Sequence, residues 1–195
     1  LGAPRRGPAV RRLIKDVLLP VAVAIALAFV IQASVAKPYE IPTESMDPTI
    51  EPGDRIIANR VVYRFRDIER GDIIVFDPPP SAQLCGQAGG GDIPFVKRVI
   101  GLPGDRVQVT ADGTTLVNRE PFEVEGPVLS DYPDEGGRGK TWPVVPEGKL
   151  LVLGDNREHS CDSHQWQPDP FLPEENVIGQ AEVTYWPLDH LGFLN

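Results

Sequence analysis

The chain has 195 residues, 41% of them hydrophobic, which suffices for one sizeable folded domain and excludes a disordered chain. Its 19 glycines and 21 prolines favour short strands broken by turns over long helices, so the composition predicts a mainly β fold. The net charge of −9 leaves no broad basic surface for a phosphate backbone, and we expect no nucleic-acid partner.

The first 36 residues predict a membrane anchor. Residues 1–16 hold five basic side chains against one acid, and residues 17–36 are twenty uncharged residues, about the length that a helix needs to cross a hydrocarbon core of roughly 30 Å. The positive-inside bias places residues 1–16 in the cytoplasm and residues 37–195 outside the plasma membrane, after one transmembrane helix. A cleavable secretory signal is the alternative, although the apolar run exceeds its usual length.

Short β-branched runs bounded by glycine, proline and aspartate predict an all-β domain over residues 37–195. The predicted strands are residues 55–58, 72–76, 95–100, 106–110, 150–153 and 181–185. Residues 118–149 are rich in proline, glycine and acids, with few apolar positions. We interpret them as an insertion or small subdomain in a β core formed by residues 37–117 and 150–195.

Ser45 is a candidate nucleophile just beyond the predicted anchor. Pro42 and Pro48 flank it, and prolines stiffen the backbone and disfavour regular strand pairing. A serine in such a segment can be held rigid and open. Turn serines are common, however, so Ser45 indicates catalysis only if a base accompanies it.

Lys97 is the candidate base. Strand alternation over residues 95–100 places Lys97 on the same face as Phe95 and Val99, while Arg98 faces the other way. A lysine buried among apolar side chains titrates below its usual value of about 10.4 and is then suited to act as a general base. The alternative is an edge strand whose lysine reaches water.

A third polar cluster follows the predicted strand at residues 150–153. It comprises Gly154-Asp155-Asn156-Arg157 and then Ser160, Asp162 and Ser163. A strand that ends in such a turn is a natural platform for a site.

The three histidines leave open a Ser-His-Asp triad as an alternative to the lysine base. They are His159, His164 and His190. A metal cluster is also conceivable at His159, Cys161, Asp162 and His164, but their spacing fits no standard zinc pattern. We therefore expect no metal and no cofactor.

From the predicted anchor to Trp186, the sequence resembles the bacterial type I signal peptidases, and four blocks carry the resemblance in the family's order. The blocks are Ser45-Met46-x-Pro48-Thr49, Gly71-Asp72-Ile73-Ile74-Val75, Lys97-Arg98-Val99-Ile100-Gly101-x-Pro103-Gly104-Asp105 and Gly154-Asp155-Asn156-Arg157-x-x-Ser160-x-Asp162-Ser163. These are membrane-anchored serine endopeptidases with a serine-lysine dyad. Lys97 separates the chain from the endoplasmic reticulum forms, which use histidine.

The resemblance implies that Ser45 attacks the scissile carbonyl and that neutral Lys97 takes its proton. It also implies that the hydroxyl of Thr43 forms the oxyanion hole with the backbone N–H of Ser45, where hydrogen-bond donors stabilise the developing charge.

Three further residues match supporting positions of the family. Ser160 is expected to orient the lysine, and Asp162 and Arg98 are expected to form a charged pair beside the site. His164 departs from the commoner bacterial pattern, which has an arginine there, although cyanobacterial and plastid relatives also have histidine. The contact of Asp162 with Arg98 is therefore expected to lose a partner, and His164 is the weak point of the resemblance.

The implied substrate is a secreted preprotein whose signal peptide lies extended along a strand edge and presents small side chains before the cut. The residues expected to line its pockets are Ile41, Met46, Ile50, Phe95 and Val96. The lipid bilayer is the second implied partner. We expect Trp186 or Trp166 at its interface, with core packing as the alternative for both tryptophans.

Two rival functions stay open, and so does the question of a disulfide bond. The first rival is an anchored β domain without catalysis that binds peptides or envelope proteins. The second is the self-cleaving repressor family, which resembles this one in core fold and dyad but has a DNA-binding domain and lacks a membrane span. Cys85 and Cys161 face an oxidising side in the predicted topology, so they form either a disulfide or two free thiols.

Overall fold

The computed structural model describes residues 14–85, 93–123 and 138–194. The chain divides into two compact units, Leu1–Lys37 and Pro38–Asn195.

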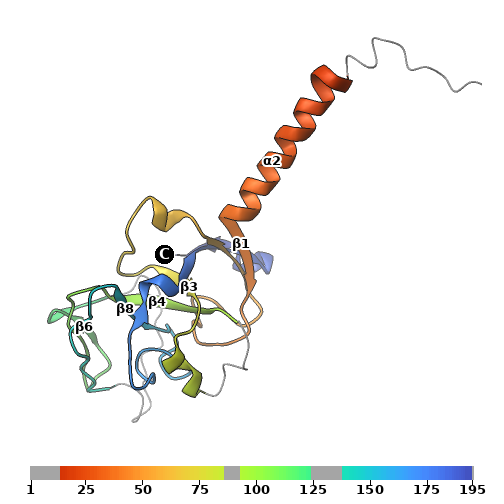
Figure 1. The fold of residues 1–195 in the computed structure, drawn as a ribbon. Helices are drawn as coiled ribbons and strands as arrows, with labels where there is room; N and C mark the ends of the chain where they lie inside the picture. The colour runs from red at the N-terminus through yellow and green to blue at the C-terminus, as the bar shows by residue number, and fades with distance from the viewer. Residues whose placement is uncertain (1–13, 86–92, 124–137, 195) are drawn as a thin grey trace, which may run out of the picture. The chain divides into compact units, whose positions relative to one another are not determined.

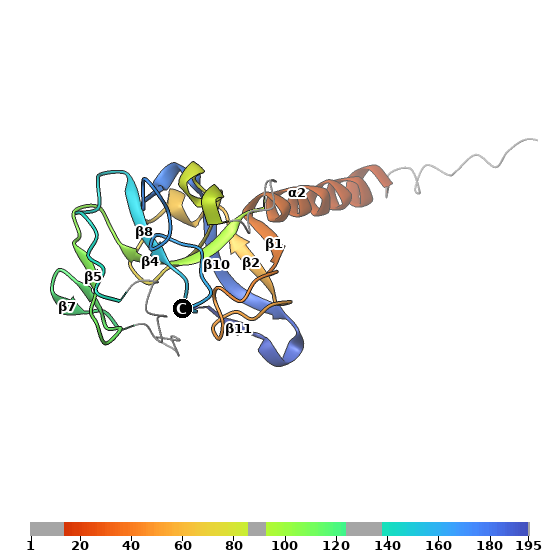
Figure 2. The same cartoon turned by 90° about the horizontal axis from the view of Figure 1, so that it is seen from below.

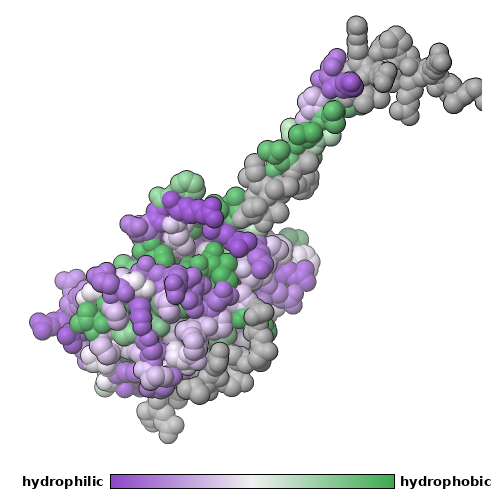
Figure 3. Space-filling view, in the orientation of Figure 1, coloured by the Kyte–Doolittle hydropathy of each residue, from purple (hydrophilic) through white to green (hydrophobic). Residues whose placement is uncertain are grey.

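The first unit is helical. A π-helical turn at Ile14–Leu18 (η1) leads into α2, Leu19–Val35, and its described side chains are largely apolar, as the green surface along α2 shows (Figure 3). Within the described residues, no helix combines the length and hydropathy that a membrane crossing requires. The transmembrane helix predicted over residues 17–36 is therefore not confirmed.

The second unit is built on an eight-stranded sheet with the order β1-β2-β10-β3-β4-β8-β9 and with β11 paired to β10 (Figures 1 and 2). The strands are β1 Ala36–Glu40, β2 Arg55–Asn59, β3 Ile73–Phe76, β4 Phe95–Gly101, β8 Lys149–Leu153, β9 Leu172–Pro173, β10 Val177–Trp186 and β11 Gly192–Phe193. This architecture confirms the mainly β fold.

A three-stranded sheet lies on the β8 side of this unit, opposite β1 and β2 (Figures 1 and 2). Its strands are β5 Val107–Val109, β6 Thr115–Val117 and β7 Glu120–Pro121, so it begins before the predicted insertion at residues 118–149. Residues 124–137 of that insertion lie outside the described part. Trp142 and Val145 pack with Val107 and Val117 in one apolar core, which makes the end of the predicted insertion part of the folded domain.

Short 3₁₀ turns connect the strands. They are η2 Val62–Arg64, η3 Pro80–Cys85, η4 Glu174–Asn176 and η5 Leu188–His190.

Strand β4 is central to the large sheet, between β3 and β8. Its side chains alternate between two apolar cores, since Val96 belongs to one core and Val99 to another. Lys97 and Arg98 are consequently both buried, at 4% and 1% exposed. Two cations inside a protein need specific partners, and those partners define the candidate site.

Candidate active site

Ser45 lies on the loop between β1 and β2. The next turn fixes it, because Met46 and Ile50 are buried in the core below the loop and the N–H of Ile50 donates to the carbonyl of Met46 at 3.0 Å. Ser45 itself is 6% exposed. The serine is thus held by apolar packing and by backbone hydrogen bonds of its own loop.

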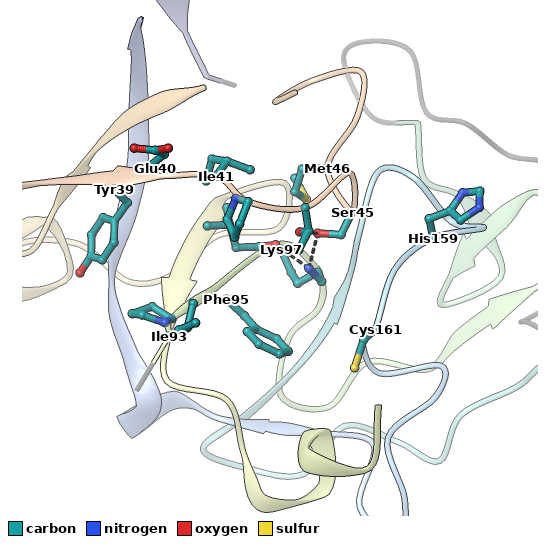
Figure 4. A pocket seen from close by; sticks show the side chains of 14 residues that line it. Tyr39, Glu40, Ile41, Ser45, Met46, Ile93, Phe95, Lys97, His159 and Cys161 are labelled. Atoms are coloured by element: carbon teal, nitrogen blue, oxygen red, sulfur yellow. Dashed lines mark hydrogen bonds between the residues drawn. The ribbon is translucent and has the colours of Figure 1, made fainter. Parts of the chain in front are cut away.

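Lys97 reaches Ser45 from β4. Its Nζ lies 2.6 Å from Oγ of Ser45 and 2.9 Å from the carbonyl oxygen of Val96 (Figure 4), and 5.5 Å from the centre of the Phe95 ring. Burial lowers the pKa of Lys97 from 10.5 to about 8, although two nearby aspartates act in the opposite direction. The neutral amine, which can accept a proton from Ser45, is therefore accessible near neutral pH.

Thr43 places a second hydroxyl beside the nucleophile. Its Oγ1 lies 3.3 Å from Oγ of Ser45, and Thr43 is exposed, so its hydroxyl is free to turn toward a substrate. A hydroxyl at this position suits an oxyanion hole.

Arg98 and Asp162 do not form the charged pair that the sequence predicts. Arg98 instead binds Asp155, with Nε donating to Oδ1 at 2.9 Å and Nη2 to Oδ2 at 2.8 Å, and this pair is buried. The register of β4 with β8 sets Arg98 opposite Leu153, so the carboxylate two residues further along is within its reach. Thr49 donates to the same carboxylate at 2.7 Å, which links Asp155 to the serine loop.

Asp162 has other partners. Its Oδ2 accepts hydrogen bonds from the N–H of Gly154 at 2.8 Å and from the hydroxyl of Ser160. Its Oδ1 accepts from the N–H of His164 at 3.0 Å and lies 2.7 Å from Nδ1 of the same histidine. Burial alone would raise the pKa of Asp162, but the contacts with His164 and Ser160 lower it overall. His164 thus faces Asp162 at the position where the resemblance expects an arginine.

Ser160 lies in the same cluster as Asp162, but it does not bond to Lys97 as predicted. Its hydroxyl donates to Asp162, whereas Nζ of Lys97 bonds to Ser45 and Val96. The hydroxyl of Ser160 is therefore tied to the buried carboxylate two residues away in the chain.

Gly154 brings the last block against the nucleophile. A Cβ atom at this glycine would meet Oγ of Ser160 at 2.2 Å and the carbonyl oxygen of Ser45 at 2.3 Å. The N–H of Asn156 also donates to that carbonyl at 3.2 Å. The sequence marked this block as a site platform, but it assigned no role to Gly154, Asp155 or Asn156, because the groups that they meet at the site, on Ser45 and Arg98, are more than 50 residues away in the chain.

The three histidines lie away from the hydroxyl of Ser45, whose partners are the side chains of Thr43 and Lys97. His164 contacts Asp162, and Nδ1 of His190 lies 2.8 Å from Asp54. His159 lines a pocket beside the serine loop. A Ser-His-Asp triad is therefore not assembled. Within residues 14–85, 93–123 and 138–194, no group of three or more His, Cys, Asp or Glu side chains is arranged to hold a metal ion.

An apolar pocket of about 250 Å³ opens beside the serine and the lysine. Four of the five residues predicted to bind substrate line it, namely Ile41, Met46, Phe95 and Val96. The prediction for Ile50 is wrong, because Ile50 is fully buried in the core beneath the loop. Phe95 and Ile93 lie on one side of the Ser45–Lys97 contact and His159 lies on the other (Figure 4).

Cys161 also lines this pocket, and it is disulfide-bonded. The side chain of Cys85, the other cysteine of the chain, lies outside the described residues. A covalent bond therefore holds the loop that carries Ser160 and Asp162.

A buried serine in contact with a lysine of lowered pKa, beside an apolar pocket, is an arrangement typical of serine hydrolases. The family model described as "Signal peptidase, peptidase S26" matches residues 14–186. The chain belongs to this family, and the predicted class of enzyme, a serine endopeptidase of the signal peptidase I type, is confirmed.

Three curated relatives illustrate the match. Signal peptidase I of Leptolyngbya laminosa is 43% identical over 174 residues, which cover 89% of this chain and 80% of the relative. Probable signal peptidase I-1 of Synechocystis sp. is 39% identical over 188 residues, covering 96% and 90%. Probable thylakoidal processing peptidase 2 of Arabidopsis thaliana is 41% identical over 167 residues, covering 84% and 42%.

Proposed function

We propose that the chain removes N-terminal signal peptides from secreted preproteins, with Ser45 as nucleophile and neutral Lys97 as general base. The observation that carries the assignment is the 2.6 Å contact between Nζ and Oγ, in a buried setting that lowers the pKa of the lysine. Membership of the signal peptidase family supports the class of substrate.

The reaction proceeds in two halves. Oγ of Ser45 attacks the scissile carbonyl carbon while Nζ of Lys97 takes the hydroxyl proton, and the oxyanion accepts hydrogen bonds from the N–H of Ser45 and the hydroxyl of Thr43. The Lys97 ammonium then protonates the leaving amine as the peptide bond breaks, which leaves an acyl-enzyme. Neutral Lys97 next deprotonates a water that hydrolyses the ester, and Ser45 recovers its proton.

The pocket fits the small apolar residues that precede the cut. Ile41 and Met46 from the serine loop, with Phe95 and Val96 from β4, line it, and such walls disfavour charged or bulky side chains. An extended signal peptide fits between these two segments by pairing as a strand.

We further propose that residues 17–36 anchor the chain in the plasma membrane, with residues 1–16 in the cytoplasm and the catalytic unit outside. The uncharged length and the preceding basic cluster support this topology. Trp186 is 48% exposed, next to the exposed Leu188, whereas Trp166 is fully buried, so Trp186 is the tryptophan suited to a lipid surface. A preprotein in the same bilayer then meets the enzyme at a raised effective concentration.

Alanine substitution of the dyad tests the assignment. We expect Ser45→Ala and Lys97→Ala each to lower kcat/KM for a preprotein in detergent by about 10³-fold or more, because each removes a participant in proton transfer and attack. The assay is gel-based cleavage, with circular dichroism to verify the fold.

Two matched controls accompany these variants. Ser81 is a serine of similar burial, 8% exposed against 6% for Ser45, and Lys149 pairs with Asp169 away from the pocket. Ser81→Ala and Lys149→Ala should retain cleavage. Full activity of either dyad variant refutes the assignment, whereas no cleavage by the unmodified chain would favour the rival of a β domain without catalysis.

A further inference from the structure

A second cavity, of about 430 Å³, adjoins the apolar pocket. The two cavities share four lining residues, which are Pro42, Thr43, His159 and Cys161. Because Thr43 lines both and its Oγ1 lies 3.3 Å from Oγ of Ser45, the two cavities meet beside the candidate nucleophile.

The second cavity differs from the first in its chemistry. Its other lining residues are Glu44, Pro52, Glu158, Ser160 and Gln165. Both glutamates are exposed, and no lysine or arginine lines the cavity. Its rim is therefore polar and negatively charged, whereas the pocket beside Phe95 is apolar.

The direction of the substrate follows from the apolar pocket and rests on the proposed function. If the residues before the cut occupy that pocket, an extended chain that passes Ser45 must continue on the far side. His159 lies on that side in Figure 4, across the Ser45–Lys97 contact from Phe95, and His159 lines the second cavity.

We propose that this second cavity binds the first residues of the mature protein after the cut, and that Glu44 and Glu158 select for basic side chains there. Glu44 is adjacent to the nucleophile in sequence, and Glu158 lies on the loop that carries Ser160. The two carboxylates thus approach the cavity from separate segments. Exposed charge pairs contribute modestly, so the selection amounts to several-fold in rate.

Three matched peptides test the proposal on the full-length chain in detergent. They are identical up to the cut and carry Lys, Gln or Glu at the second position after it. We expect kcat/KM in the order Lys, Gln, Glu, with about a tenfold range between Lys and Glu at low salt that narrows as the salt concentration rises. In the Glu44→Gln/Glu158→Gln double variant, the ratio of Lys to Glu peptide should fall to about one or two.

A second double variant controls for net charge. Glu147 and Glu175 are exposed and line neither cavity, so Glu147→Gln/Glu175→Gln removes the same charge and should keep the tenfold range. Equal cleavage of all three peptides by the unmodified chain overturns the proposal, and so does a range that survives in the Glu44/Glu158 variant. If no peptide is cleaved, the proposed function itself fails.

Discussion

The amino group of Lys97 owes its chemistry to the strand that buries it. Burial is what lowers its pKa, because the nearby Asp162 and Asp155 act to raise the pKa and burial outweighs them. A lysine is suited to this role because it can lose its proton at accessible pH, whereas an arginine cannot. The cost of the arrangement is a buried amine that is charged at neutral pH.

That cost predicts a gain in stability when the charge is removed. The lowered pKa, about 8 against an ordinary 10.5, indicates that Lys97→Met raises the free energy of unfolding at pH 7 by about 1–3 kcal/mol while it abolishes cleavage. Urea unfolding followed by tryptophan fluorescence measures the difference.

The pH dependence of the same experiment has a definite sign. Between pH 8 and 10.5 the unfolded chain still binds the Lys97 proton and the folded chain has released it, so the stability of the unmodified chain rises with pH in this window. The advantage of Lys97→Met should therefore shrink from pH 8 to 10.5. A variant that is less stable than the unmodified chain at pH 7 would show that the buried amine is not destabilising.

Thr43 offers a separate test of the oxyanion hole. Thr43→Val keeps the shape of the side chain but removes the hydroxyl, and we expect kcat to fall by about 10²-fold with little change in melting temperature. Thr43→Ser restores a hydroxyl and should restore most of the activity. Equal rates for the two variants would exclude a role for this hydroxyl.

The contact between Ser45 and Lys97 was predictable from sequence, but the contacts around it were not. Ser45 and Lys97 stand in recognisable blocks, and strand alternation gave a reason for the lysine to be buried. The partner of Arg98 depends on how β4 registers against β8, where Arg98 lies opposite Leu153. That register depends on residues far apart in the chain. Asp162 was therefore predicted as the partner of Arg98, whereas the structure has Asp155 in that role.

At the scale of elements, the strands with β-branched runs were predictable, and most of the strands that were missed are short. All six predicted runs fall on strands, and the run at 181–185 lies within the longer β10. The missed strands include β7, β9 and β11, each of two residues. Segments this short cannot show an alternation of apolar and polar residues, and they form strands because a partner strand lies beside them.

The packing of β8's end against the serine loop predicts that Gly154 admits no side chain. In Gly154→Ala, the added Cβ would lie 2.2 Å from Oγ of Ser160 and 2.3 Å from the Ser45 carbonyl oxygen, so the loop must move. We expect kcat/KM to fall by about 10²-fold or more, because small displacements of a nucleophile are costly, and stability to fall by about 1–3 kcal/mol.

Gly192 of β11 provides the control for this substitution. The nearest atom to a Cβ at Gly192 is 3.9 Å away, so Gly192→Ala should leave both cleavage and stability nearly unchanged. An active, stable Gly154→Ala variant would mean that the last block does not fix the position of Ser45.

At the scale of the whole molecule, the site joins segments that are far apart in the chain. The turn after β8 lies beside β4 because the two strands are neighbours in the large sheet, and the loop after β1 reaches the middle of β4 through the contact of Ser45 with Lys97. The fold class was predictable from composition. The meeting of these three segments was not, because it depends on the order of the strands in the sheet. Residues 17–36 belong to the other unit, Leu1–Lys37, and their role as an anchor stays a prediction.

The pH dependence of cleavage tests the central claim most directly. Lys97 must be neutral to accept the Ser45 proton, so kcat/KM for a peptide without titrating groups should rise about tenfold per pH unit below its pKa of about 8 and level off above it. The measurement is the initial rate of cleavage from pH 5 to 10 at constant ionic strength. An acid limb centred near 8 is the predicted result, and a rate that is flat from pH 6 to 10 would contradict Lys97 as the base.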